Sequence, residues 1–201
     1  MAHVGLRNPY KIGVTGGIGS GKSVVSRLLR LMGVPVYDCD SEAKRLMCSK
    51  NAVRDALIAA VGNEVYCADG TLNRAFLSAY MFGYPERVAQ VNGIVHPAVR
   101  ADFDEWARCS GQAVVAVESA ILFEAGMDAD VDAVWLVCAP ESLRLQRAML
   151  RDGASEAAIK RRMQSQMNDE HIAQRASFIV RNDGHSSLIN QVTSLLQGLR
   201  K

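Results

Sequence analysis

The sequence predicts an α/β fold in which helices cover a five-stranded parallel sheet. Two observations support this fold class. Short apolar runs of strand length alternate along the chain with segments whose apolar residues recur at the spacing of a helix. The run at 113–118 is apolar up to its last residue, which is typical of a strand buried on both faces of a parallel sheet. The chain has 201 residues, 49% hydrophobic and 22% charged, so we expect one globular domain.

The first predicted strand, 10–15, leads into a glycine-rich turn and then into a predicted helix at 24–32. Residues 16–23 read GGIGSGKS and fit the P-loop pattern G-x-x-x-x-G-K-[ST], in the strand–loop–helix context that this pattern requires. Glycines allow positive φ and a close approach of the backbone to a ligand, and the amides at a helix N-terminus attract an anion. The alternative is a turn that only connects strand to helix.

The P-loop interpretation predicts that this stretch binds the phosphates of a nucleoside triphosphate. We expect Lys22 to reach the β- and γ-phosphates and the Ser23 hydroxyl to bind Mg²⁺. The residues expected to bind the nucleotide here are Gly17, Ile18, Gly19, Ser20, Gly21, Lys22, Ser23 and Val24.

A second predicted strand, 34–37, runs directly into Asp38 and Asp40. Because ligands of open α/β sheets lie at the carboxyl ends of the strands, we expect both carboxylates close to the phosphate loop. They could help to hold Mg²⁺ through water, and one could take a proton from an attacking hydroxyl. The alternative for Asp40 is to cap a helix that begins at Ser41.

Residues 41–111 are predicted to form a helical insert between the second and third strands. We expect one helix over 41–61, one capped by Asn73, and one that starts at Pro85 and is broken at 96–97, with a further helix beyond. An insert beside the strand ends is a natural place for a second substrate.

Two residues of this insert are candidates for binding. Arg74 could bind a phosphate with two hydrogen bonds, although from its spacing a solvated arginine in a first helical turn is the simpler interpretation. His96 taken alone is more typical of a hydrogen-bonded structural histidine than of a catalyst.

Three more strands are expected, at 113–118, 133–138 and 178–180. Glu118 closes the third strand, at the position of a Walker-B-type acid; the alternative is a surface glutamate. Asn182 follows the fifth strand in a turn where an adenine could lie. An amphipathic helix over 188–199 ends the chain.

Residues 141–175 are predicted to form a helical lid, which leaves 10–40, 112–140 and 176–201 as the core. A helix over 141–151 places Arg144, Arg147 and Arg151 on one face. A solvated basic face is the usual explanation, but arginines beside a phosphate loop could clamp the γ-phosphoryl group. A second helix is expected from Ser155. A lid of this kind excludes water, so that ATP is not hydrolysed.

The composition excludes several classes of protein. A net charge of +2 gives no strong case for a nucleic-acid partner. The five cysteines are scattered without a C-x-x-C pair, so neither zinc nor a disulfide framework is indicated. No secretory signal is seen in 1–9, and no apolar run reaches the length of a membrane span. We therefore expect a cytoplasmic protein with no membrane partner and no obligate protein partner.

The ordered motifs together resemble those of the dephospho-CoA kinases, a P-loop kinase family related to nucleoside monophosphate kinases. The resemblance covers nearly the whole chain. It rests on 15–23, on the D-[AC]-D segment at 36–40, on L-N-R at 72–74, V-H-P at 95–97 and I-L-F-E at 121–124, and on 147–151, 162–166 and 180–182. Two departures stand out. Many members have Asp and Pro where this chain has Glu118 and Ala120, and an Asp where it has Ser177.

The resemblance implies transfer of the ATP γ-phosphoryl group to the ribose 3′-hydroxyl of dephospho-CoA, giving CoA and ADP in the last step of CoA biosynthesis. It implies Asp40 as general base, Asp38 as a helper of metal or hydroxyl, and neutralisation of charge by Lys22, Mg²⁺, Arg147 and Arg151. On the ATP side it adds Arg147 and Asn182. Facing dephospho-CoA it places Asp40, Arg74, His96, Leu122 and Glu124.

Two other functions remain open on the same fold. The first is a kinase that uses the helical insert to bind a nucleoside or nucleotide. The second is a nucleotide-dependent switch, although the chain has no N-K-x-D motif for guanine.

Overall fold

The computed structural model describes residues 8–164, 166–167 and 169–199. They divide into two compact units. The first comprises the chain up to Tyr37 together with the part from Trp106 onward, and the second is Asp38–Glu105. Within the described ranges, no helix combines the length and the apolar character needed to cross a lipid bilayer.

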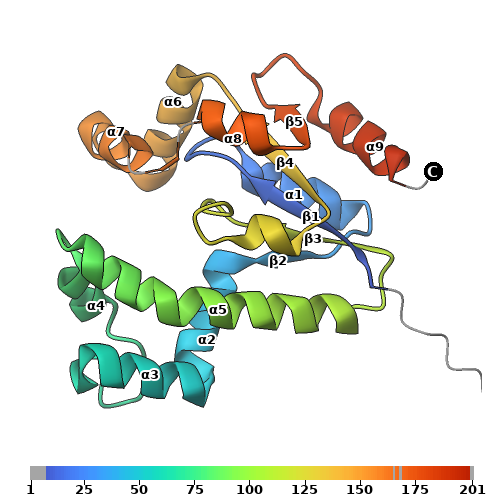
Figure 1. Cartoon of the computed structure of the whole chain (residues 1–201). Helices are drawn as coiled ribbons and strands as arrows, with labels where there is room; N and C mark the ends of the chain where they lie inside the picture. The colour runs from blue at the N-terminus through green and yellow to red at the C-terminus, as the bar shows by residue number, and fades with distance from the viewer. Residues whose placement is uncertain (1–7, 165, 168, 200–201) are drawn as a thin grey trace, which may run out of the picture. The chain divides into compact units, whose positions relative to one another are not determined.

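The first unit is built on a five-stranded parallel sheet, which confirms the predicted fold class (Figure 1). The strand order is β2-β3-β1-β4-β5. Val14 of β1 is in register with Glu118 of β3, so the carboxyl ends of these two neighbours meet at one edge. The strands are β1 (Tyr10–Thr15), β2 (Val36–Asp38), β3 (Val114–Glu118), β4 (Ala133–Cys138) and β5 (Phe178–Arg181).

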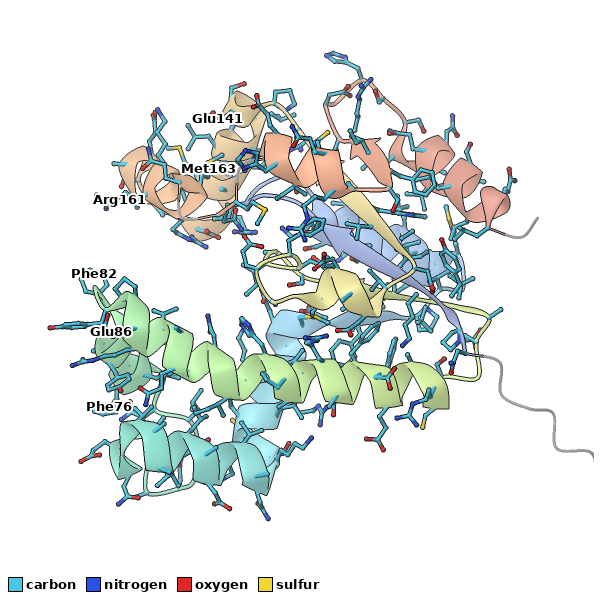
Figure 2. The ribbon with its side chains drawn as sticks, in the orientation of Figure 1. Phe76, Phe82, Glu86, Glu141, Arg161 and Met163 are labelled. Atoms are coloured by element: carbon cyan, nitrogen blue, oxygen red, sulfur yellow. The ribbon has the colours of Figure 1, made fainter. Side chains whose placement is uncertain are left out.

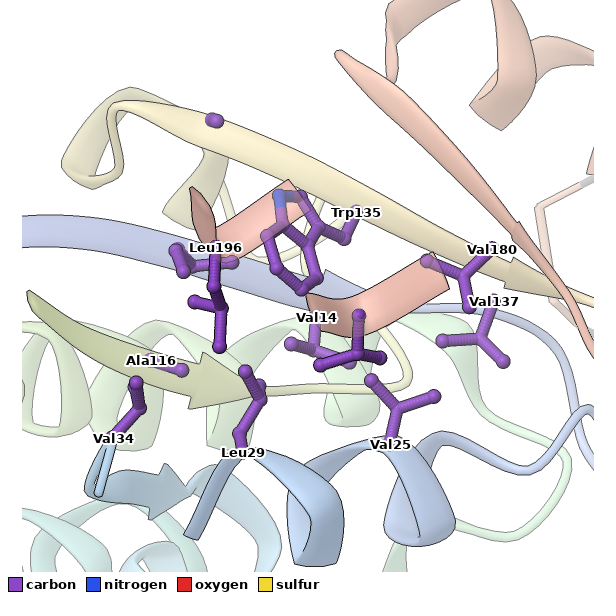
Figure 3. Close-up of a cluster of buried hydrophobic side chains, with 12 residues drawn as sticks. Val14, Val25, Leu29, Val34, Ala116, Trp135, Val137, Val180 and Leu196 are labelled. Atoms are coloured by element: carbon purple, nitrogen blue, oxygen red, sulfur yellow. The ribbon is translucent and has the colours of Figure 1, made fainter. Parts of the chain in front are cut away.

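Helices α1 (Lys22–Leu31) and α9 (Leu188–Gly198) pack on one face of the sheet. Their apolar stripes meet strand residues in a single buried cluster (Figure 3), whose members include Val25 and Leu29 of α1, Leu196 of α9, and Val14 and Trp135 of the sheet. Burial of this stripe holds α1 against the sheet, so that the N-terminus of α1 lies at the end of β1.

The other face of β1 is covered by different segments. The Cβ position of Gly13 faces away from the cluster, because successive residues of a strand face opposite sides of the sheet. A Cβ on Gly13 would lie 2.7 Å from Cδ1 of Leu122, so a larger residue would displace the segment after β3. Two short helices occur later in the chain, η2 (Met127–Asp130) after β3 and α8 (Asp169–Arg175) before β5. Helix α8 was not predicted as a separate helix.

The predicted lid contains helices α6 (Glu141–Asp152) and α7 (Glu156–Gln164) before α8. Asp152 accepts hydrogen bonds from Arg151 at 2.6 Å and from Arg162 at 2.7 Å, which joins the end of α6 to α7. These two guanidinium groups hold the pKa of the Asp152 carboxyl well below its usual range.

The second unit contains α2 (Cys39–Ser49), α3 (Asn51–Val61), η1 (Asn63–Val65), α4 (Arg74–Met81) and most of α5 (Pro85–Cys109). The prediction of one helix over 41–61 is wrong, because the backbone of Lys50 is extended and separates α2 from α3. The apolar residues of α2 and α3 recur at helical spacing as if the two helices were one, so the sequence pattern gives no sign of the break at Lys50. Asn73 caps α4 as predicted, by accepting from the Phe76 amide at 3.1 Å.

The predicted break at Pro97 is also wrong, because α5 continues through it. Proline in a helix removes one hydrogen bond and costs about 3 kcal/mol. The helix nevertheless buries a stripe of four apolar side chains on both sides of the proline, Val91, Val95, Val99 and Phe103. Each such side chain contributes about 1.5–3 kcal/mol, so burial outweighs the proline.

We predict that Leu29→Ala lowers the free energy of unfolding by about 2–5 kcal/mol, because Leu29 is fully buried between α1 and the sheet. Leu31→Ala in the same helix is the control. Leu31 is 77% exposed, so its replacement should change stability by no more than about 0.5 kcal/mol. Chemical denaturation of both variants measures the difference, and equal losses would contradict the packing described here.

Candidate active site

The glycine loop at 16–21 connects β1 to α1 and packs tightly against other parts of the first unit. Gly21 has φ +99°, and a Cβ there would lie 2.0 Å from Nδ2 of Asn182. Gly19 has φ +76°, and its Cβ would lie 2.2 Å from the carbonyl oxygen of Arg144. Glycine is therefore needed at both positions for conformation and for space.

Lys22 and Ser23 follow the glycine loop and are the residues that the motif predicts to contact phosphate and a metal ion. Nζ of Lys22 donates to the carbonyl oxygen of Gly16 at 2.7 Å, so the ammonium group folds back over the loop. The Ser23 hydroxyl donates to Oε1 of Glu118 at 3.2 Å. Glu118 therefore belongs to the loop's surroundings and is more than a surface residue at a strand end.

Arg147 and Asn182, both predicted on the ATP side, are brought together. Arg147 donates to the Asn182 carbonyl at 3.1 Å and to its Oδ1 at 3.4 Å. Asn182 in turn donates from Nδ2 to the carbonyl oxygen of Ser20 at 2.7 Å. The turn after β5 and helix α6 thus hold one side of the glycine loop.

Two more side chains bind the loop at Ile18, and the resemblance did not assign them a role. Arg144 donates from Nε to the Ile18 carbonyl at 2.9 Å, and Oε1 of Gln166 accepts from the Ile18 amide at 2.8 Å. The helical spacing of Arg144 and Arg147 had placed both on one face of α6. No local pattern indicated that Arg144 would be buried in the loop.

Other predicted residues of the first unit have different partners. Arg151 is exposed and bonded to Asp152. Oε1 of Glu124 accepts from the amide of Met167 at 3.1 Å, which ties the segment after α7 to the segment after β3. The Leu122 side chain is fully buried in the core, so only the backbone of Leu122 could contact a substrate.

Asp38 and Asp40 open the second unit. The Asp38 side chain caps α2 by accepting from the amides of Asp40 at 3.0 Å and Ser41 at 3.2 Å. The interpretation of Asp40 as the helix cap is therefore wrong, because the helix begins at Cys39, two residues earlier than expected. Asp40 lies in the first turn of α2 with an exposed side chain. Its catalytic role stays a prediction.

Arg74 is the first residue of α4 and is exposed. It borders a small cavity of about 170 Å³ together with Lys44, two methionines and two leucines: Met47, Met81, Leu72 and Leu77. His96 is half-buried in α5, and this burial lowers its pKa below the usual range, which favours the neutral imidazole at pH 7.

The donor set at the loop fits a magnesium ion. Ser23 and Glu118 offer a hydroxyl and a carboxylate oxygen at the meeting point of β1 and β3. Mg²⁺ prefers oxygen ligands and is usually held by one or two protein groups together with substrate phosphates and water.

Comparison with known proteins identifies the family. A family model described as dephospho-CoA kinase matches residues 10–187. The chain belongs to the dephospho-CoA kinase family. A dephospho-CoA kinase of Bacteroides fragilis is 46% identical over 189 residues, covering 92% of this chain and 91% of that protein.

Two solved structures are similar to this member of the dephospho-CoA kinase family. TT1252 from Thermus thermophilus has a TM-score of 0.84 and 32% identity, and the match covers 97% of this chain and all of that one. A dephospho-CoA kinase from Campylobacter jejuni has a TM-score of 0.62 at 22% identity, covers 96% of this chain and 98% of its own, and supports the fold alone.

We predict that Gly21→Ala weakens ATP binding by at least about 10-fold, because the methyl group would displace Asn182 and the backbone would be strained by about 1–3 kcal/mol. Gly33→Ala is the matched control. Gly33 has φ +83° but no atom within 4 Å of its Cβ position, so it carries the same kind of strain without the collision. Calorimetric titration with ATP should show unchanged affinity for the control, and similar losses in both variants would contradict the prediction.

Proposed function

We propose that the protein transfers the γ-phosphoryl group of ATP to the ribose 3′-hydroxyl of dephospho-CoA, with CoA and ADP as products. The observation that carries this proposal is the glycine loop, with Lys22 folded over it and Ser23 bonded to Glu118, in a chain that belongs to the dephospho-CoA kinase family.

The residues of the loop support a mechanism based on positioning and charge neutralisation. Phosphoryl transfer has a loose transition state, so placing the reactants and stabilising negative charge matter more than base strength. Lys22 would move from the Gly16 carbonyl to the β- and γ-phosphates, and Arg147 lies one hydrogen-bonded residue away from the loop through Asn182. Bound Mg²⁺, held by Ser23 and Glu118, would neutralise phosphate charge.

We assign acceptor binding to the predicted insert, 41–111, and closure over ATP to the predicted lid, 141–175. In the insert, Arg74 and Lys44 supply positive charge at the rim of an apolar cavity, a combination suited to a ligand with both phosphate and apolar parts. Asp40 is exposed and available as general base. The small net charge and scattered cysteines support a cytoplasmic enzyme without a nucleic-acid or membrane partner.

We expect dephospho-CoA to stimulate ADP formation from ATP and Mg²⁺, with CoA as the second product. Coupled measurement of ADP together with chromatographic detection of CoA tests this directly. Lys22→Ala should abolish transfer while leaving the melting temperature nearly unchanged. Stimulation by a nucleoside or nucleotide instead would indicate the other kinase, and slow hydrolysis that no acceptor stimulates would indicate a nucleotide switch.

We predict that Asp40→Asn lowers kcat by about 10²-fold, because it removes the proposed base without changing the size of the side chain. Helix α2 should keep its stability, since Asp38 provides its cap. Glu42→Gln, a second acidic residue in the same helical turn, is the control and should retain turnover within about twofold. Normal turnover in Asp40→Asn would remove Asp40 from the mechanism.

A further inference from the structure

We infer that Arg144 and Gln166 are positioning residues that hold the phosphate loop in its nucleotide-binding shape from the lid side. The inference rests on the proposed function only in taking the loop to be the ATP site. It assigns to two lid residues a role that acts through the backbone of Ile18.

Ile18 is held through both of its backbone polar groups. Its N–H donates to Oε1 of Gln166 at 2.8 Å, and its C=O accepts from Nε of Arg144 at 2.9 Å. These partners lie far along the chain, one in α6 and one just after α7. Two bonds on opposite groups of one residue restrict the orientation of the loop tip more than either bond alone.

Both the backbone and the guanidinium group of Arg144 lie against the glycine loop. The residue as a whole is only 8% exposed, which is rare for arginine unless the guanidinium is bonded. A Cβ on Gly17 would lie 2.0 Å from Nη2 of Arg144, and a Cβ on Gly19 would lie 2.2 Å from its carbonyl oxygen. Glycine at these two positions therefore makes room for Arg144, in addition to allowing a close approach of phosphate.

The surroundings of these residues support a role in positioning more than in core packing. Arg144 and Gln166 both line an open cavity of about 690 Å³, together with Glu141, Met163 and Met167 (Figure 2 labels Glu141 and Met163). A buried positive charge beside the loop also favours an anion there. A loop that is held in its binding conformation by these residues loses less conformational entropy when it binds phosphate.

The experiment replaces each residue by an apolar side chain of similar length and measures ATP affinity by calorimetry. Arg144→Met should raise the Kd of ATP by about 10-fold or more, and Gln166→Met by about 3-fold or more, because each loses a hydrogen bond to the loop. The KM of dephospho-CoA should stay within about twofold. Arg144→Lys, which keeps the charge and one donor, should recover part of the loss.

Arg161→Met and Gln197→Met are the matched controls, since both residues are exposed, Arg161 on α7 and Gln197 on α9. Neither control should change ATP affinity. If Arg144→Met and Gln166→Met lower the melting temperature while the ATP affinity of the folded protein is unchanged, the two residues are structural and the inference is wrong.

A double-mutant cycle tests the contact with Gly17 independently of turnover. Gly17→Ala should weaken ATP binding in the native background, because the methyl group displaces the guanidinium. In the Arg144→Met background the same change should have a much smaller effect, so the two losses are not additive. Additive losses would overturn the inference. Because the readout is ATP binding alone, a different acceptor would leave this result unaffected.

Discussion

The close contact between the glycine loop and its neighbours is the constraint on which the first unit depends. Each of three glycines has its Cβ position filled by another group: the Arg144 guanidinium at Gly17, the Arg144 carbonyl at Gly19 and the Asn182 amide at Gly21. These groups reach the loop because β4, which precedes α6, lies beside β1, and β5, which precedes Asn182, lies beside β4. The order of the strands therefore brings distant parts of the chain to the loop.

The parts of the fold that local sequence patterns determine were predictable. The strands and the glycine loop follow from apolar runs and from one motif, whereas the errors lie where burial outweighs local preference. Pro97 predicts a helix end, but the apolar residues on either side keep α5 intact. Lys50 has no feature of a helix break, yet its extended backbone separates α2 from α3. Asp38 and Asp40 are both good caps by type, and a small shift of the helix start decided between them.

The candidate site was predictable in its residue types and less so in its contacts. Ser23 with Glu118 and Arg147 with Asn182 meet, although both pairs are far apart in sequence. Two departures from the family pattern, at Glu118 and Ser177, keep a polar contact, whereas nothing in the structure explains Ala120. Glu118 still reaches Ser23 with its longer side chain, and the Ser177 hydroxyl accepts from the Val134 amide at 3.0 Å, a bond that an aspartate could also accept. The burial of Arg144 depends on residues more than a hundred positions away, so no pattern around it could reveal it.

The residues predicted to bind nucleotide and those predicted to bind the acceptor belong mostly to different units of the chain. The groups that shape the loop all belong to the first unit, while Asp40, Arg74 and His96 belong to the second. Arg144 and Asn182 donate hydrogen bonds to the loop backbone, and Gln166 accepts one from it. Because changes at residues with no shared partners are close to additive, affinity for nucleotide and affinity for acceptor should respond separately to mutation. The predicted lid is joined to the phosphate loop through the hydrogen bonds of Arg144 and Gln166 to Ile18.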